Sequence, residues 1–232
     1  MKYAVLLTLL GVAQLALAAQ HRGIAWLLVW SGVSFIVVGA AYAGAGPGVF
    51  GKRPDGTMRA ANVLLLLPYL LFTRAVWFLQ TRLSREPARS EVLPGLWLGR
   101  RIGAAEMPPG TRLVVDLTAE FPEPRAVRTG CSYLCLPVLD YSVPEERALR
   151  DVVRRVTACD EGVVYIHCAL GHGRSALVTA AVLLGRSAAG DAAEAERLVK
   201  AARFGVELSA VQRALLGRLA VADQEALSAE KV

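Results

Sequence analysis

A cysteine, two glycines, an arginine and a serine stand close together in the stretch IHCALGHGRS, residues 166–175. The run Val163–Ile166 before the cysteine is apolar and predicts a buried strand, and the apolar residues 175–184 predict a helix. Cys168 would therefore lie at the carboxyl end of a strand, where open α/β sheets bind ligands. His167 is expected to orient the loop from beneath rather than to act as a base.

The loop between this strand and this helix has the features of an anion site. Gly171 and Gly173 permit unusual backbone angles, so the loop amides can point inward around a tetrahedral anion at the positive end of the helix. Arg174 can bind two oxygens of that anion with its planar guanidinium. The residues expected to bind phosphate are Ala169, Leu170, Gly171, His172, Gly173 and Arg174.

The same positive field favours the thiolate form of Cys168. A thiolate held beneath a bound phosphate is placed for in-line attack on phosphorus. Ser175 can hydrogen-bond the sulfur and help it to leave when the phosphoenzyme is hydrolysed. The stretch therefore predicts catalysis through a covalent cysteinyl phosphate, with Cys168, Arg174 and Ser175 as catalytic residues.

The pattern His-Cys-x-x-Gly-x-x-Arg-Ser at His167–Ser175 resembles the signature of the cysteine-dependent protein tyrosine phosphatases, and its surroundings resemble their dual-specificity branch. The resemblance covers about residues 91–220. It includes EVLPGLWLG at 91–99 and VDLTAE at 115–120, which are similar to the first two strands of that branch. It implies a phosphoric monoester hydrolase with the fold of a dual-specificity phosphatase.

The resemblance also implies a general acid on a loop that follows the preceding strand. Asp140 lies 28 residues before Cys168 at the end of a predicted strand, and it would protonate the leaving oxygen and then act as a base. Alternatively, Asp140 caps the helix that begins near Pro144. Glu145 and Glu146 are reserve acids, although glutamates in a first turn usually interact with the helix dipole.

Two other functions fit parts of the pattern. A membrane-tethered, non-catalytic phosphate-binding module would usually have lost the cysteine or the arginine, and both are present. A sulfur transferase also presents a cysteine on a loop, but such loops tend to be one residue shorter, and Asp140 would then have no role.

The C-terminal part of the chain alternates strand and helix patterns, which predicts an α/β domain with a mostly parallel sheet that is flanked by helices and covered on both faces. Asp116 lies within a buried-strand pattern and is expected to be structural. The predicted strands are 92–98, 113–117, 132–139 and 163–166, and the predicted helices begin near residues 144, 175, 191 and 209.

The N-terminal part predicts two or three transmembrane helices, in a membrane region over residues 1–83. The apolar segments are about 3–19, 23–45 and 61–80. The first segment could instead be a signal peptide, with Ala16-Leu17-Ala18 as a cleavage site. Arg74 near the middle of the third would cost about 2.5–3.5 kcal/mol in a bilayer. A linker over 84–90, a catalytic domain over 91–222 and a tail over 223–232 complete the predicted organisation.

The charge is uneven along the chain. Residues 1–89 have nine Lys or Arg and two Asp or Glu, whereas residues 90–232 have seventeen and eighteen. The basic residues therefore flank the apolar segments and do not form a nucleic-acid surface. They are balanced around the third segment, so the positive-inside rule leaves the orientation open. A cytoplasmic catalytic domain at an inner or plasma membrane is expected from the free cysteines.

Four cysteines and only three histidines offer poor prospects for a metal site, and the loop needs no cofactor because amides and Arg174 supply the positive field. Cys131 and Cys135 are expected to be small buried residues. A disulfide between them, or a resolving role toward Cys168, stays open.

The substrate is less constrained than the reaction. Phosphatases that act on phosphoinositides usually have lysines in this loop, and here Ala169, Leu170 and His172 occupy those positions. A monophosphate is therefore expected, either on a protein side chain or on a lipid. The membrane segments combined with this domain resemble the branch that acts on phosphatidylglycerophosphate, and they suit a receptor-like protein phosphatase equally well.

Overall fold

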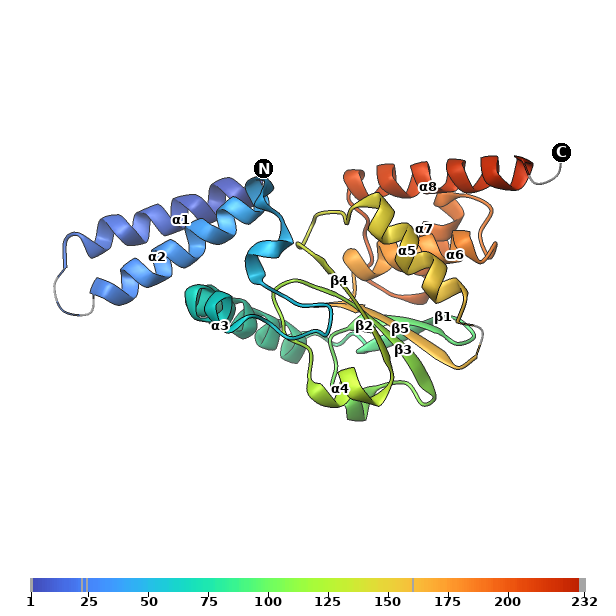
Figure 1. Cartoon of the computed structure of the whole chain (residues 1–232), viewed down its shortest axis with the longest axis horizontal. Helices are drawn as coiled ribbons and strands as arrows, with labels where there is room; N and C mark the ends of the chain where they lie inside the picture. The colour runs from blue at the N-terminus through green and yellow to red at the C-terminus, as the bar shows by residue number, and fades with distance from the viewer. Residues whose placement is uncertain (1, 22, 24, 160, 230–232) are drawn as a thin grey trace. The chain divides into compact units, whose positions relative to one another are not determined.

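The computed structural model describes residues 2–21, 23, 25–159 and 161–229, and the chain divides into two compact units (Figure 1). One unit comprises Met1–Ser84 with Ala119–Pro122, and the other comprises Arg85–Thr118 with Glu123–Val232. Residue 24 of the second predicted segment and residues 230–232 of the predicted tail lie outside the described residues.

The first unit is built from apolar helices. Helices α1 (Lys2–Ala18) and α2 (Ala25–Ala40) form a hairpin, in which a Cβ on Gly11 would lie 2.6 Å from the carbonyl oxygen of Gly32. The short helices η1 (Ala41–Ala45) and η2 (Pro47–Phe50) lead to α3 (Ala60–Leu83). The indole of Trp30 in α2 donates a hydrogen bond to the carbonyl oxygen of Leu64 in α3 over 3.0 Å. Glycines thus allow the backbones of α1 and α2 to approach closely.

Two helical segments are long and apolar enough to cross a membrane. They are α2 continued by η1 (Ala25–Ala45) and α3 (Ala60–Leu83). Helix α1 has 17 residues and is apolar but shorter. Most of α3 is exposed, since only 6% of the residues in its most apolar stretch are buried. The composition and exposure of these helices are compatible with membrane insertion.

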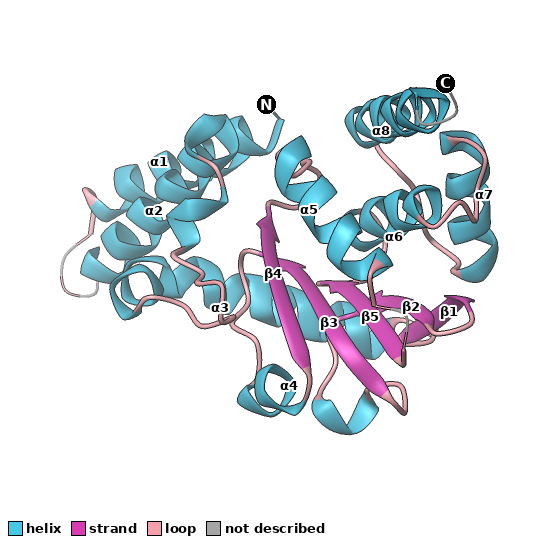
Figure 2. Ribbon diagram, turned by 45° about the vertical axis from the view of Figure 1, so that its right-hand side comes forward, coloured by secondary structure: helices cyan, strands magenta, loops and turns pink. Residues whose placement is uncertain are grey.

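The second unit contains a five-stranded sheet in the order β1-β2-β5-β3-β4 (Figure 2). Pairing is parallel between β2 and β5, β5 and β3, and β3 and β4, and antiparallel between β1 and β2. The strands are β1 Arg89–Leu93, β2 Leu96–Arg100, β3 Thr111–Thr118, β4 Ser132–Val138 and β5 Val163–Cys168. The mostly parallel sheet predicted from the sequence is therefore present.

The prediction of one strand over residues 92–98 is wrong. Pro94 and Gly95 form a tight turn between β1 and β2, and Gly95 has a φ of 78°, which glycine adopts without strain. The two short strands form an antiparallel hairpin at the edge of the sheet.

Four helices cover one face of this sheet (Figure 2). They are α5 Glu146–Thr157, α6 Arg174–Gly185, α7 Ala192–Ala202 and α8 Ala210–Ala229. Helix α6 is buried almost throughout, and its Leu177 packs in one core with Val115 and Ile166 of the sheet. Helix α8 continues to Ala229, past residue 222, where the sequence analysis ended the domain.

The opposite face of the sheet is also covered, as the sequence predicted, by a smaller set of elements. Val114 and Tyr165 pack there against Ile102 and against Val127 of the short helix α4 (Arg125–Gly130), which was not predicted. The short helix η3 (Ala104–Glu106) precedes β3. The site is therefore positioned mainly by the helices α5–α8 and by the loops at the carboxyl edge of the sheet.

Candidate active site

The predicted phosphate loop lies at the carboxyl edge of the sheet. Strand β5 is central, ends at Cys168 and pairs with β2 and β3 on its two sides. Helix α6 begins at Arg174, so the segment Cys168–Arg174, here called the phosphate loop, joins the strand to a helix N-terminus. Neighbouring strands on both sides hold the cysteine in place.

A backbone amide and a hydroxyl group converge on the sulfur of Cys168. The Gly171 amide donates to Sγ over 3.2 Å, and the Ser175 Oγ lies 3.5 Å from Sγ. Gly171 has a φ of +84°, and a Cβ on it would lie 2.4 Å from the carbonyl carbon of Gly99. Only glycine fits this position, because any side chain would collide with the backbone of β2.

Arg174 and Asp140, which the sequence assigned separately, lie together. The buried Arg174 donates through Nη1 to the Val138 carbonyl over 2.9 Å, and its Nε lies 3.3 Å from Oδ1 of Asp140. Since Val138 is the last residue of β4, the end of this strand and the start of α6 meet at the loop.

Asp140 lies in a tight turn after β4. The Ser142 amide donates to the Leu139 carbonyl over 3.1 Å, and Tyr141 has a φ of 57°. The left-handed backbone costs a residue other than glycine about 1–2 kcal/mol. The turn directs Asp140 toward Arg174 and leaves the Tyr141 side chain exposed.

These side chains line one pocket of about 410 Å³. Asp140 and most of the phosphate loop line one part of it, and the segment between α7 and α8 lines the other together with the start of α8. Of the predicted site residues, Gly171, Ser175 and His167 lie behind the lining, where they contact Cys168. The lining residues are Asp140, Tyr141, Cys168, Ala169, Leu170, His172, Gly173, Arg174, Gly205, Glu207, Leu208, Ser209, Ala210, Gln212 and Arg213.

Gln212 is a polar lining residue that the sequence analysis missed. It is buried in the first turn of α8, where its Oε1 accepts from the Ser209 amide over 2.9 Å and its Nε2 donates to the Ser142 carbonyl over 3.4 Å. It shares the buried face of α8 with Leu215, Leu216 and Leu219. A glutamine at helical spacing from three buried leucines is the signal that could have identified it.

Arg203 is a second residue that the sequence did not single out. Its buried guanidinium donates to the carbonyl oxygens of Gly171 over 2.8 Å, Leu170 over 3.0 Å and Pro87 over 2.8 Å. Burial lowers the pKa of Arg203, and the nearby Glu86 carboxylate opposes that shift. Arg203 thus holds two carbonyl groups of the phosphate loop on the side away from the pocket.

His167 is fully buried beneath the loop. Its Nδ1 lies 3.4 Å from the Cys168 carbonyl oxygen, its Nε2 lies 3.9 Å from Oε1 of Glu123, and its ring stacks on Tyr165. These contacts suit a residue that orients the loop.

Asp116, Glu123 and His167 form the group of side chains whose geometry could hold a metal ion. Asp116 accepts hydrogen bonds from the hydroxyl groups of Thr118 over 2.7 Å and of Tyr133 over 2.6 Å. Burial raises the pKa of Tyr133, and the negative charge of Asp116 raises it further. Glu123 lies 3.3 Å from the guanidinium of Arg101. Both carboxylates have protein partners, so this buried network is explained without a metal and Asp116 has structural contacts.

The reserve acids have other surroundings. Glu145 is the N-cap residue of α5, and Glu146 pairs with Arg150 over 3.0 Å and with Arg218 over 3.2 Å. Hydrogen bonds from Arg150 and Arg218 hold the pKa of Glu146 below its usual range, which makes it a poor proton donor. The cysteines outside the loop are half-buried and form no disulfide, and burial raises the pKa of Cys131.

Residues 104–229 match the family model described as PTP-SAK, the Swiss Army Knife protein with a DSP-PTPase phosphatase domain. The match covers more than half of the chain. The chain belongs to this family. It is therefore a phosphatase of the dual-specificity class that acts on phosphate esters, and the resemblance found in the sequence is confirmed at that level. No curated protein matches it.

Solved structures of several phosphatases are similar to this chain. A mouse putative dual specificity phosphatase complexed with zinc tungstate is 28% identical, with a TM-score of 0.55, over 61% of this chain and 91% of that one. Human DUSP28 is 26% identical, with a TM-score of 0.53, over 60% of this chain and 96% of that one. PTPMT1 in complex with PI(5)P, at 18% identity and a TM-score of 0.55 over 61% and 99%, shares the fold.

Proposed function

We propose that this phosphatase hydrolyses phosphate monoesters through a cysteinyl phosphate on Cys168, and that its N-terminal helices anchor it in a membrane. The observation that supports this most directly is that Cys168 and Arg174 line one pocket, while the Gly171 amide and the Ser175 hydroxyl contact the Cys168 sulfur from behind the lining. A nucleophile and a cationic guanidinium on one small pocket suit a phosphate group.

In the first step the Cys168 thiolate attacks phosphorus while Arg174 binds two of its oxygens. The sulfur–phosphorus bond forms, the ester oxygen–phosphorus bond breaks, and Asp140 gives its proton to the departing oxygen. Arg174 lies against Asp140, so the group that binds phosphate also orients the acid. In the second step Asp140 removes a proton from water, which attacks phosphorus, and Ser175 donates a hydrogen bond to the leaving sulfur.

We expect Asp140→Asn to lower kcat by about 10²-fold on an alkyl phosphate, because general acid catalysis contributes about 10²–10⁴-fold. The amide keeps an oxygen for Arg174 but has no acidic proton. An aryl phosphate with a good leaving group should be affected less. Steady-state kinetics on both substrates tests this, with Glu145→Gln as the matched control. An unchanged rate on the alkyl phosphate would assign the acid to another residue.

The proposed substrates are proteins phosphorylated on tyrosine, serine or threonine. The mouse putative dual specificity phosphatase and human DUSP28 are both more than 25% identical to this chain, and the phosphate loop has one arginine and no lysine, which suits a single phosphate group. Steady release of phosphate would also exclude the alternative of a non-catalytic binding module.

A lipid monophosphate is the second candidate, favoured by apolar side chains around the pocket. Tyr141 is 63% exposed, Phe204 83% and Val211 59%, and each lines the pocket or adjoins a lining residue. Exposed apolar groups gathered at one site usually mark an interaction surface. They could contact the acyl region of a lipid such as phosphatidylglycerophosphate as well as an apolar peptide.

We expect detergent-purified full-length protein to have a higher kcat/KM on phosphopeptides than on phosphatidylglycerophosphate in mixed micelles. Phe204→Ser should lower kcat/KM on the preferred substrate by about tenfold through lost apolar contact and leave a small aryl phosphate unaffected. If the lipid instead gave the higher kcat/KM and Phe204→Ser removed this preference, the proposed substrate would be the lipid and not a phosphorylated protein. A reporter fused to the C-terminus would test the proposed cytoplasmic location of the domain.

A further inference from the structure

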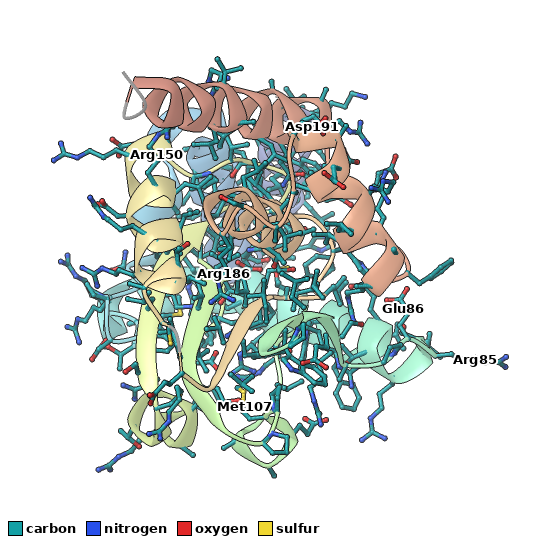
Figure 3. The ribbon with its side chains drawn as sticks, turned by 90° about the vertical axis from the view of Figure 1, so that its right-hand side faces the viewer. Arg85, Glu86, Met107, Arg150, Arg186 and Asp191 are labelled. Carbon is teal, nitrogen blue, oxygen red and sulfur yellow. The ribbon has the colours of Figure 1, made fainter. Side chains whose placement is uncertain are left out.

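The segment that follows α3 contacts the phosphate loop and its support. Nε2 of His172 lies 2.7 Å from Oε2 of Glu86, the Pro87 carbonyl accepts from Arg203 over 2.8 Å, and the Ala88 carbonyl accepts from the Arg100 amide over 2.9 Å. In Figure 3, Glu86 lies beside the carboxyl end of α7, whereas the Arg85 side chain points away from the domain. This stretch, Glu86–Ala88, is therefore part of the packing around the active site.

Glu86 reaches the phosphate loop by two routes. The direct route is its ion pair with His172, a residue that lines the pocket. The indirect route is Arg203, whose Nη2 lies 3.8 Å from the same carboxylate oxygen and which donates to the loop carbonyls of Leu170 and Gly171. One carboxylate thus balances a buried guanidinium and fixes a loop imidazole.

The backbone at Gly205 leaves space for this arrangement. Gly205 has a φ of +77°, and a Cβ on it would lie 3.0 Å from Oε1 of Glu86 and 3.1 Å from Nε2 of His172. Any larger residue would be strained and would press on the ion pair. Both partners are also partly buried, with side-chain exposures of 32% for His172 and 26% for Glu86, so the pair is less screened than a surface salt bridge.

We propose that Glu86 is a positioning residue for the phosphate loop, acting through His172 and Arg203; this inference rests on the proposed function of that loop. Because α3 ends at Leu83, Glu86 stands three residues beyond the last apolar helix. The segment that joins the apolar helices to the catalytic domain therefore helps to set the affinity of the loop for phosphate. Loss of the carboxylate would free the His172 ring and leave Arg203 without its acidic neighbour.

The test is Glu86→Gln in the full chain, with Arg85→Gln as the matched control. We measure Kd for inorganic phosphate by calorimetry, KM and kcat on a small aryl phosphate, and Tm. Glu86→Gln should raise both Kd and KM by about three- to tenfold, the range expected for contacting residues, with a smaller change in kcat and a Tm near that of the parent. Arg85→Gln should change none of them.

A double-mutant cycle separates positioning from general stability. If Glu86 acts through His172, the effects of Glu86→Gln and His172→Gln on phosphate Kd should be less than additive. His172→Gln breaks the same ion pair from the loop side, so it serves as the test if Glu86→Gln does not fold. Unchanged Kd and KM in the folded variants, or additive effects, would overturn the proposal. If the parent protein bound no phosphate, the proposed function would fail instead.

Discussion

Cys168→Ser is expected to abolish phosphate ester hydrolysis and to preserve phosphate binding. A serine hydroxyl is a far weaker nucleophile than a thiolate at neutral pH, so we expect kcat to fall by about 10⁴-fold or more. In the proposed mechanism the loop amides and Arg174 bind phosphate, and the substitution leaves both in place. Release of inorganic phosphate and calorimetric titration with phosphate or vanadate measure the two properties separately.

The matched control for this variant is Cys159→Ser. Cys159 is a half-buried free thiol near the end of α5, outside the lining of the pocket. It should retain the activity of the parent. Turnover in Cys168→Ser above about 1% of the parent rate would contradict the assignment of the nucleophile.

Arg174→Lys is expected to have the second largest effect, a fall of about 10³-fold in kcat/KM with weakened phosphate binding. An arginine that stabilises the transition state of phosphoryl transfer contributes about 10³–10⁵-fold. Lysine keeps the charge but lacks the planar fork, so it cannot bind two phosphate oxygens while it contacts Val138 and Asp140. Kinetics on an aryl phosphate and phosphate Kd test this expectation.

Arg186→Lys is the control for Arg174→Lys. Arg186 follows the carboxyl end of α6, whereas Arg174 begins this helix, and Arg186 donates to the backbone carbonyls of Val156 and Cys159 outside the lining of the pocket. Its replacement should affect stability more than kcat/KM. If Arg174→Lys retained kcat/KM within a few-fold of the parent, charge alone would suffice and the bidentate role would be wrong.

The parts of the site that come from contiguous sequence were predictable. The stretch His167–Ser175 follows an apolar strand pattern and precedes a helix pattern. The cysteine, the glycines and the arginine could therefore be placed on one loop from their spacing in the sequence. Asp140 was also named, because it follows the preceding strand in the chain at a suitable distance before Cys168. Its contact with Arg174 depends on how β4 and α6 meet, and the sequence does not contain that distance.

The support of the loop could not be predicted in the same way. Arg203 and Glu86 come from two segments that the chain folding brings to the loop, and neither stands in a recognisable local pattern. The hairpin of β1 and β2 was missed because the turn at Pro94 and Gly95 interrupts what otherwise reads as one apolar run. Phe204, which we propose to contact the substrate, follows α7 in the sequence, and only the structure gives its exposure.

The central claim is a covalent phosphate on Cys168, and its most direct test is to trap that intermediate. Full-length protein turning over a phosphorylated substrate is denatured rapidly in detergent, digested and analysed by mass spectrometry. We expect one phosphoryl group on the peptide that contains Cys168, bonded to sulfur and absent from the Cys168→Ser protein. A phosphoryl group on another residue, or turnover with no phosphoryl group on the Cys168 peptide, would contradict the proposed mechanism.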